Sequence, residues 1–185
     1  MRNSRLLSAT ELKPGVLLVA APNLLDPNFK RSVVLLCEHS DTGSFGLILN
    51  QDITVEMSEL LENAVHVGGP VQMDTLYFLH RFGSDVDGTV EVCQDVFWGG
   101  EFQNLQDAIK KEEVTKSDVR FYLGYAGWTE GQLEEEVEAN GWILTQGSSN
   151  LVFDTDSSAL WREVMIRLGG EFALLANYPD EPLLN

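Results

Sequence analysis

The sequence predicts an α+β fold built on a mainly antiparallel sheet. Apolar or alternating segments typical of strands are joined by short turns, and helical patterns interrupt them irregularly. The regular alternation of strand and helix that marks a doubly wound sheet is missing. The length of 185 residues and the 44% hydrophobic content suit one domain, residues 1–185, with a substantial core. We expect 1–7 and 178–185 to be loose tails.

Seven segments have the apolar run or the alternating pattern of a strand. In chain order they are 16–20, 32–37, 45–50, 75–80, 89–92, 119–125 and 142–145. The turn Asp41-Thr42-Gly43 separates the second segment from the third, so we expect 32–50 to form a hairpin. The turn Asp87-Gly88 lies between the fourth and fifth segments, which are expected to flank it as strands.

Helical spacing of apolar residues predicts four helices. They lie near 57–61, over 101–111, over 130–139, and from 157 to the glycine pair 169–170. The third has signals at both ends, because Thr129 and Gln132 have the spacing of a capping box and Asn140-Gly141 is a C-cap pattern. Asp156 or Ser157 is expected to cap the fourth helix.

The net charge of the chain indicates which classes of partner it disfavours. Twelve basic residues against 29 acidic ones give a net charge of -17. Nucleic-acid binding depends on Lys and Arg neutralising phosphates, so direct DNA binding is disfavoured, and an anionic membrane surface would repel the chain. The longest apolar run, 16–21, is too short for a membrane helix, and 1–7 lacks a signal-peptide core. We therefore expect a cytoplasmic protein.

The two cysteines, Cys37 and Cys93, are expected to be reduced and largely buried. Each lies in a predicted strand, and they lack the CxxC spacing of a redox or metal motif. A cytoplasmic location also disfavours a disulfide. A small buried thiol explains both residues better than a disulfide or a metal ligand does.

Several catalytic and cofactor motifs are absent from the sequence. It contains no P-loop, no GxGxxG after a strand, and no GxSxG, since Gly43-Ser44-Phe45-Gly46 does not match that pattern. The three histidines lie in different segments without the spacing of a zinc site. The loop that begins with 83–88 fails the calcium-loop pattern, because its first position is Gly83 and its twelfth is Gln94. We assign no catalytic residue, no metal and no cofactor.

Polar residues and glycines at turns and strand ends remain as candidates for ligand binding. They are Asp26, His39, Asn50, Gly68, Gly69 and Gln132. Each has a structural alternative as well. Asp26 is suited to an Asx-turn before a proline, His39 to a surface position as well as to acid–base chemistry, and Asn50 to backbone hydrogen bonds as well as to a ligand.

The remaining candidates, Gly68, Gly69 and Gln132, are suited to binding an anion. The N–H groups of Gly68 and Gly69 could form an anion-binding nest, although a tight turn is the simpler interpretation. Gln132 lies at a predicted helix N-terminus, a position that attracts anions. The glutamates at 134–136 and 138 would oppose an anion there, and the simpler interpretation of them is a solvated acidic helix face.

Taken together, these segments resemble the AlgH/YqgE family of bacterial proteins. The matching stretches are 15–22, 26–29, 31–34, 38–39, 43–50, 68–71, 79–80, 123–128 and 131–134, with Glu136 and Trp142. The resemblance implies an α+β fold whose branched sheet curls into a pseudo-barrel with helices outside. It implies no assigned activity, because the family's label as a transcriptional regulator derives from an alginate-regulation phenotype and not from a known DNA-binding element.

The chain departs from the family pattern in two places. Ser44-Phe45 stands where relatives often have Ala-Met, and 176–182 replaces a terminal segment rich in Gly, His and Ala. Our leading hypothesis is a non-enzymatic binding or indirect regulatory module that recognises a protein partner or a small ligand. The alternative is a hydrolase or transferase with a polar pocket near Asp26, His39, Asn50 and Gly68-Gly69. The sequence leaves the oligomeric state open.

Overall fold

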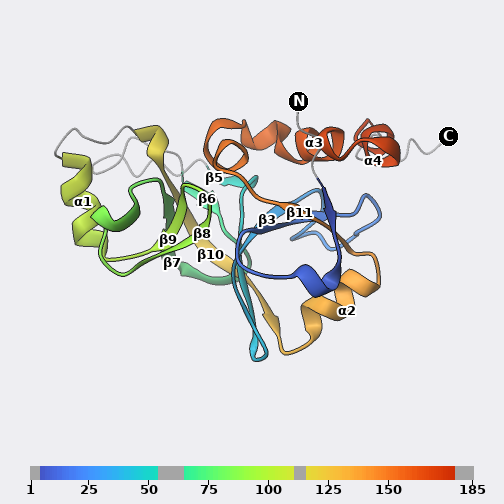
Figure 1. Cartoon of the computed structure of the whole chain (residues 1–185), viewed down its shortest axis with the longest axis horizontal. Helices are drawn as coiled ribbons and strands as arrows, with labels where there is room; N and C mark the ends of the chain where they lie inside the picture. Colours follow the sequence, from blue (N-terminus) through green and yellow to red (C-terminus); the bar gives the residue numbers. More distant parts are fainter. Residues whose placement is uncertain (1–4, 54–64, 111–115, 178–185) are drawn as a thin grey trace.

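The computed structural model describes residues 5–53, 65–110 and 116–177 and shows a curved sheet with helices around its outside (Figure 1). The strands are β1 (Leu6–Leu7), β2 (Val16–Ala20), β3 (Val33–Ser40), β4 (Gly43–Ile48), β5 (Asp52–Ile53), β6 (Val65–Val67), β7 (Val71–His80), β8 (Thr89–Cys93), β9 (Val96–Gly99), β10 (Val119–Thr129) and β11 (Trp142–Gln146). The α-helices are α1 (Phe102–Lys110), α2 (Gln132–Glu138), α3 (Ser157–Leu168) and α4 (Gly170–Leu175). Short 3-10 or π-helical turns lie at Ala9–Glu11, Gly83–Asp85, Lys116–Asp118 and Asn150–Asp154.

Strand β10 is where the sheet branches. The sheet order is β1-β11-β2-β3-β4-β10-β7-β9-β8, and β6 joins β10 off this path. The first part of β10 pairs with β7 antiparallel and with β6 parallel, whereas Ala126 to Thr129 pair with β4. A register shift between Leu123 and Tyr125 separates the two parts. The order has open ends at β1 and β8, so the sheet forms a half-barrel, and the predicted α+β fold with mainly antiparallel pairing is confirmed.

Strand β2 and the first five residues of β3, Val33 to Cys37, are buried on both faces, which explains their uninterrupted apolar sequences. Leu17 and Leu35 face the core cluster that packs under α3, while Leu18 and Val34 face the cluster that packs under α2. A third cluster lies under α1, around Leu105. Each of these helices therefore covers a different part of the sheet, and Figure 1 shows α1 at the opposite end of the molecule from α2 and α3. None of the described helices has the length and apolar composition needed to cross a bilayer.

Most predicted elements are present, and the hairpin over 32–50 is confirmed by the antiparallel pairing of β3 with β4. The prediction of a loose tail over 1–7 is wrong at its end, because Leu6 and Leu7 pair with Thr145 and Leu144 as β1. Hydrogen bonds to β11 order this short segment, and a contact so distant in sequence leaves no local signal. The tail at 178–185 and the helix near 57–61 lie outside the described residues.

The region after β7 differs from the prediction. Strand β8 forms its hairpin with β9, which the sequence analysis missed, and the turn between them passes through Asp95 at a φ of 57°. Asp87-Gly88 therefore does not connect two paired strands, because β7 pairs with β9 and not with β8. Strands β5 and β6 were missed as well. These three missed strands and β1 are short, and the sheet rather than the local pattern stabilises them.

The helix termini show which sequence signals are used. Asn140 takes the left-handed conformation after α2, and the N–H of Gly141 bonds to Glu136 O at 2.9 Å, which forms the predicted C-cap. The capping box at the other end is incomplete, because Gly131 is the N-cap and Thr129 ends β10. For α3 the cap is Asp156, which accepts from the Ser158 N–H. The glycine pair ends α3 as predicted, but α4 begins directly after Gly169.

Both cysteines are free thiols, but they differ in exposure. Cys37 is buried in β3, and burial raises its pKa well above the usual value. Cys93 is half-buried, so the expectation that both are largely buried holds only for Cys37. Burial raises the pKa of Cys93 to about 11. Each thiol is therefore protonated near neutral pH.

We expect both thiols to alkylate slowly in the native protein, since the thiolate is the reactive form. At pH 7.5 Cys93 should react about tenfold more slowly than an unperturbed cysteine, since its smaller thiolate fraction is partly offset by the higher nucleophilicity of a more basic thiolate, and Cys37 more slowly still because it is also inaccessible. Mass spectrometry after timed iodoacetamide exposure, with urea-unfolded protein as the control, measures both rates. Native labelling of Cys37 at the unfolded rate would contradict its burial.

His80 is a buried histidine that serves the fold. Its Nε2 lies 2.9 Å from Thr89 Oγ1, and its Nδ1 accepts from the Phe82 N–H at 3.2 Å, which assigns the proton to Nε2. The rings of Phe82 and Phe97 stack on the imidazole. Desolvation lowers the pKa of His80 to about 4, so the ring is neutral near pH 7.

His80 should make stability fall with pH on the acid side. Above pH 6.5 the ring is neutral in both states; below it, only the unfolded state takes up the proton until the pH approaches 4. The free energy of unfolding should lose about 3 kcal/mol over this window through His80 alone. Urea unfolding of the wild type and His80→Gln between pH 7.5 and 4.5 should give a steeper loss for the wild type. Parallel curves, or an imidazole NMR titration near pH 6.5, would contradict this.

Candidate functional site

A pocket of about 440 Å³ lies between the β2–β3 loop and α2. Four segments of the chain line it. They are the β2–β3 loop with Asn23, Leu24, Asp26 and Phe29, the end of β10 with Gly127 and Trp128, α2 with Gln132 and Glu136, and the stretch from Ala139 through Asn140 and Gly141 to Trp142 at the start of β11. Its volume is within the range of small-molecule sites.

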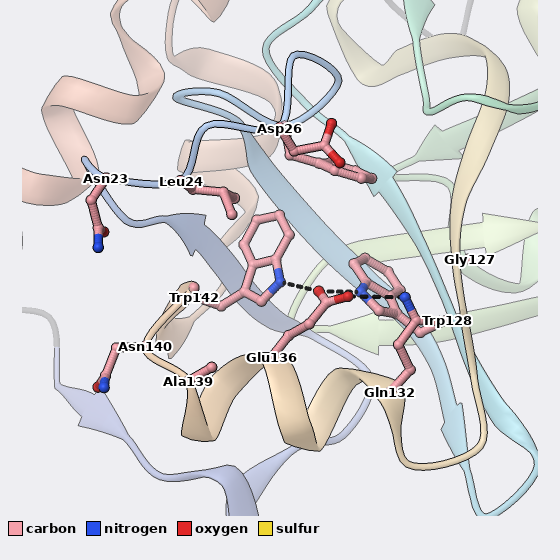
Figure 2. Close-up of a pocket in the computed structure, with 12 residues that line it drawn as sticks. Asn23, Leu24, Asp26, Gly127, Trp128, Gln132, Glu136, Ala139, Asn140 and Trp142 are labelled. Atoms are coloured by element: carbon pink, nitrogen blue, oxygen red, sulfur yellow. Dashed lines mark hydrogen bonds between the residues drawn. The ribbon is translucent and has the colours of Figure 1, made fainter.

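Glu136 is the polar centre of this pocket. Its Oε2 accepts the indole N–H groups of Trp128 at 2.9 Å and Trp142 at 2.8 Å, and its Oε1 accepts the amide of Gln132 at 2.9 Å. Figure 2 shows the carboxylate between the two indoles, with Asp26 on the other side of the pocket. Four residues on three elements are therefore held in one hydrogen-bonded arrangement.

The indole rings also form the apolar wall. Trp128 and Trp142 are 6% and 4% exposed, and their rings meet edge to face at 6.0 Å between centroids. Phe29 packs on both, stacked on Trp128 and edge-on to Trp142. The alternation of β10 turns Trp128 inward beside the exposed Gly127, and Leu133 anchors α2 beneath the pocket. The site therefore rests on core packing rather than on loops alone.

Asp26 is placed by the local chemistry of its loop. Its Oδ1 accepts the Asn28 N–H at 2.8 Å, and its carbonyl accepts the N–H groups of Phe29 and Lys30. This is the Asx-turn that the sequence allows, and it directs an exposed carboxylate over the pocket (Figure 2). Asp26 thus both stabilises its own loop and lines the pocket.

Of the six sequence candidates, Asp26 and Gln132 line this pocket. Gln132 is used within the protein, since its Oε1 accepts the Thr129 N–H at 3.0 Å and its amide donates to Glu136. The other four candidates, His39, Asn50, Gly68 and Gly69, are not among the lining residues. The predicted residues therefore do not form a single polar pocket.

His39 lies on the β3–β4 hairpin and contacts α2 from the side. Its Nδ1 is 2.8 Å from Ser44 Oγ, and its Nε2 is 3.7 Å from Glu134 Oε1. A hydroxyl, an imidazole and a carboxylate thus lie in a row. The contact supplies the carboxylate that an acid–base role for His39 would require.

Asn50 has a structural role in the chain. Its Nδ2 donates to Arg31 O at 2.9 Å, and its Oδ1 accepts the Val33 N–H at 2.8 Å. These bonds join the loop after β4 to the start of β3, where Arg31 has a φ of 53°. Of the two alternatives that the sequence left open for Asn50, backbone bonding is the one observed.

Gly68 and Gly69 lie where the chain passes close to β10. The Gly68 N–H donates to Leu123 O at 2.8 Å, and its carbonyl accepts the Ile48 N–H at 2.8 Å. A Cβ on Gly68 would overlap the Gly124 carbonyl, and one on Gly69 would overlap the Tyr125 carbonyl. Close backbone approach explains both glycines, and the Gly68 N–H is committed to a backbone bond instead of an anion.

Sequence reasoning missed Glu136 as a site residue. It placed this glutamate on a solvated acidic face, which holds for the exposed Glu135 but not for Glu136. The available signal was helical spacing, because Glu136 lies four residues after Gln132 and three after the buried Leu133. The N–H groups of Trp128 and Trp142 hold the Glu136 carboxylate toward the protein, and sequence spacing alone does not reveal these bonds.

A second hollow of about 420 Å³ lies between the β8–β9 turn and 146–150. It is lined by Cys93, Gln94, Asp95, Gln146, Gly147, Ser148, Ser149 and Asn150. No group of three or more side chains suited to holding a metal ion occurs in the part of the chain that the structure describes. The pocket around Glu136 has the aromatic wall and convergent polar groups typical of a ligand site, so we treat it as the candidate functional site.

Comparison with known proteins places this fold in a family. A family model described as AlgH-like matches residues 17–173. A UPF0301 protein of Chlorobaculum tepidum is 44% identical over 180 residues, covering 94% of this chain and 96% of that protein. The crystal structure of a protein from Corynebacterium diphtheriae matches with a TM-score of 0.78 at 26% identity, covering 91% of this chain and 93% of that one. The solution structure of AlgH from Pseudomonas aeruginosa matches with a TM-score of 0.70 at 29% identity, covering 90% and 94%. The chain therefore belongs to the AlgH-like family.

Proposed function

We propose that this chain is a cytoplasmic, non-enzymatic binding module whose ligand site is the pocket around Glu136. The observation that carries the proposal is the ordered carboxylate in an open pocket, held by two nearly buried indoles and by Gln132. Such pre-organised polar groups in an aromatic setting lower the entropic cost of binding a ligand. The cytoplasmic location is supported by the two free cysteines.

Any regulatory role would then be indirect, through a ligand or a protein partner. The net charge of -17 disfavours direct contact with nucleic acid or with an anionic membrane. The pocket itself adds to this argument, because its two charged lining residues, Asp26 and Glu136, are both acidic. A phosphate group would be repelled from it.

The enzymatic alternative depends on the row formed by Ser44, His39 and Glu134. A nucleophile also needs a space for the substrate and donors for the developing negative charge. None of these three residues lines the pocket, and the Gly68 N–H, which the sequence offered as one member of an anion-binding nest, bonds to Leu123. The geometry therefore supports binding at Glu136 better than catalysis at His39.

The proposal is tested by screening the wild-type protein against small molecules of positive, negative and zero charge. The readout is the ¹⁵N–¹H shift of the Trp128 and Trp142 indoles, because both N–H groups bond to Glu136. We expect at least one compound to move both indole resonances in a saturable way at millimolar concentration or below. If no compound in any charge class does so, the proposal fails.

A pocket-filling variant provides the control. Ala139 lines the pocket and is exposed at the end of α2, so Ala139→Leu should fill space without disturbing the core. Glu138→Leu adds a similar side chain one residue away, outside the lining. Binding at this site predicts weaker affinity for Ala139→Leu than for Glu138→Leu. Equal affinities would place the ligand elsewhere.

A further inference from the structure

The charges of the pocket point to the class of its ligand. Asp26 and Glu136 are the charged residues among the described side chains that line it, and none of the lining residues is a lysine, arginine or histidine. Within the described part of the chain, no basic side chain forms an ion pair with either carboxylate. Glu136 is held by neutral N–H donors and not by a cation, so a cationic ligand would add the oppositely charged partner that the described residues do not supply.

Each carboxylate retains capacity to accept hydrogen bonds. A carboxylate oxygen has about two acceptor positions. Two indole N–H groups occupy those of Glu136 Oε2, whereas Oε1 accepts only the Gln132 amide in the described structure. Asp26 Oδ1 accepts the Asn28 N–H, and no hydrogen bond to Oδ2 is formed by the described residues. An acceptor therefore remains for a ligand on each of two sides of the pocket (Figure 2).

The surroundings strengthen the preference for a cation. Helix α2 has the sequence QLEEEVE, with four glutamates and no basic residue. A charge of one sign around a recess raises the local concentration of ligands of the opposite sign. The whole chain, at -17, acts in the same direction.

The aromatic rings distinguish between kinds of cation. An aromatic cage for a quaternary ammonium offers open ring faces. Here the indoles are 6% and 4% exposed, because they pack on one another and on Phe29, and their edges point to Glu136. The carboxylates are therefore the groups available for recognition. They bind a cation that carries N–H donors more strongly than one that carries none, because they form charge-assisted hydrogen bonds with it.

From these contacts we infer that the pocket binds an organic cation with N–H donors, an alkylammonium or guanidinium group, between Asp26 and Glu136. The inference rests on the proposed function, since it names the ligand class of the same site. The cation can belong to a free amine or to a lysine or arginine side chain of a protein partner. Both sources present the same chemistry to the two carboxylates.

The test uses the full-length protein and the indole ¹⁵N–¹H shifts of Trp128 and Trp142. The probes are 1,5-diaminopentane, agmatine and a capped Gly-Lys-Gly peptide, compared with tetramethylammonium, the neutral 1,5-pentanediol and the anion glutarate. We expect the N–H cations to bind at least tenfold more tightly than the other three. If the peptide binds more tightly than the free amines, the natural cation belongs to a protein partner. If a free amine binds more tightly, the natural ligand is a small molecule.

Two variants of equal charge provide the matched control. Asp26→Asn removes a pocket carboxylate, and its side-chain oxygen can still accept the Asn28 N–H, so the loop should keep its shape. Glu135→Gln removes one negative charge from the exposed face of α2, outside the lining. We expect Asp26→Asn to weaken cation binding about tenfold and Glu135→Gln less than twofold.

The outcomes separate this inference from the proposed function. Equal weakening by the two variants would mean that net charge alone attracts the cation, and the inference would be wrong. Tighter binding of glutarate or pentanediol would also overturn it, while leaving the pocket as a ligand site. Failure of every probe here and of every compound in the wider screen would overturn both.

Discussion

Gly69→Ala is expected to prevent stable folding. Gly69 has a φ of 154°, and an added Cβ would overlap backbone atoms of Tyr125 and Ala126 in β10. Backbone atoms of a central strand cannot move aside as the end of a side chain can. The loss of stability should therefore exceed about 4 kcal/mol, which is exceptional for a single substitution and is expected from steric overlap in the core. Soluble yield and urea unfolding measure it.

The matched control is Gly131→Ala. Gly131 also has a positive φ, 73°, but a Cβ there would meet nothing within 4 Å. It should lose about 1–2 kcal/mol through the left-handed conformation alone. If both variants lost the same amount, backbone conformation and not close approach would explain Gly69, and a ligand-binding role for the 68–69 turn would regain support.

Trp128→Ala is expected to cost about 3–5 kcal/mol. The ring is 6% exposed, packs on Phe29 and Trp142, and belongs to the core cluster under α2. Its removal leaves a cavity and takes one of the two indole donors from Glu136 Oε2. Denaturant unfolding of the variant and the wild type measures the difference.

Two further variants divide this effect into its parts. Trp128→Phe keeps much of the ring packing and removes the N–H donor, so it should cost less than Trp128→Ala. Glu135→Gln, on the exposed side of the same helix, should stay within about 0.5 kcal/mol of the wild type. Unchanged stability of Trp128→Ala would show that the ring is dispensable to the core and would favour a role in contacting a ligand or partner.

The sequence by itself determined the features that depend on local chemistry. Uninterrupted apolar runs indicated β2 and β3, because a strand buried on both faces has no polar alternation. Turn residues located the β3–β4 hairpin, and Asn140-Gly141 located the end of α2. The Asx-turn of Asp26 likewise followed from its neighbours.

The short strands at Leu6–Leu7, Val65–Val67 and Val96–Gly99 were decided only by the tertiary structure. Each is stabilised by a partner strand, and β1 and β6 pair with segments far away in the chain, so the local sequence carries little trace of them. The same limit applied to Gly68 and Gly69. Both positions require glycine because the backbone of β10 passes too close to leave room for a Cβ. The contacting residues of β10 lie more than fifty positions later in the sequence.

The candidate site shows this division most clearly. The sequence supplied Asp26 and Gln132 as polar residues at local turns and helix ends. Helical spacing places Glu136 near Gln132 and Leu133, but it does not show that the carboxylate is bonded, because a glutamate in an acidic helix is solvated unless some other element brings donors to it. Those donors are the indoles of β10 and β11, which the fold places on either side of α2. A hydrogen bond between side chains on different elements depends on packing, and packing is set only when the whole sheet has formed.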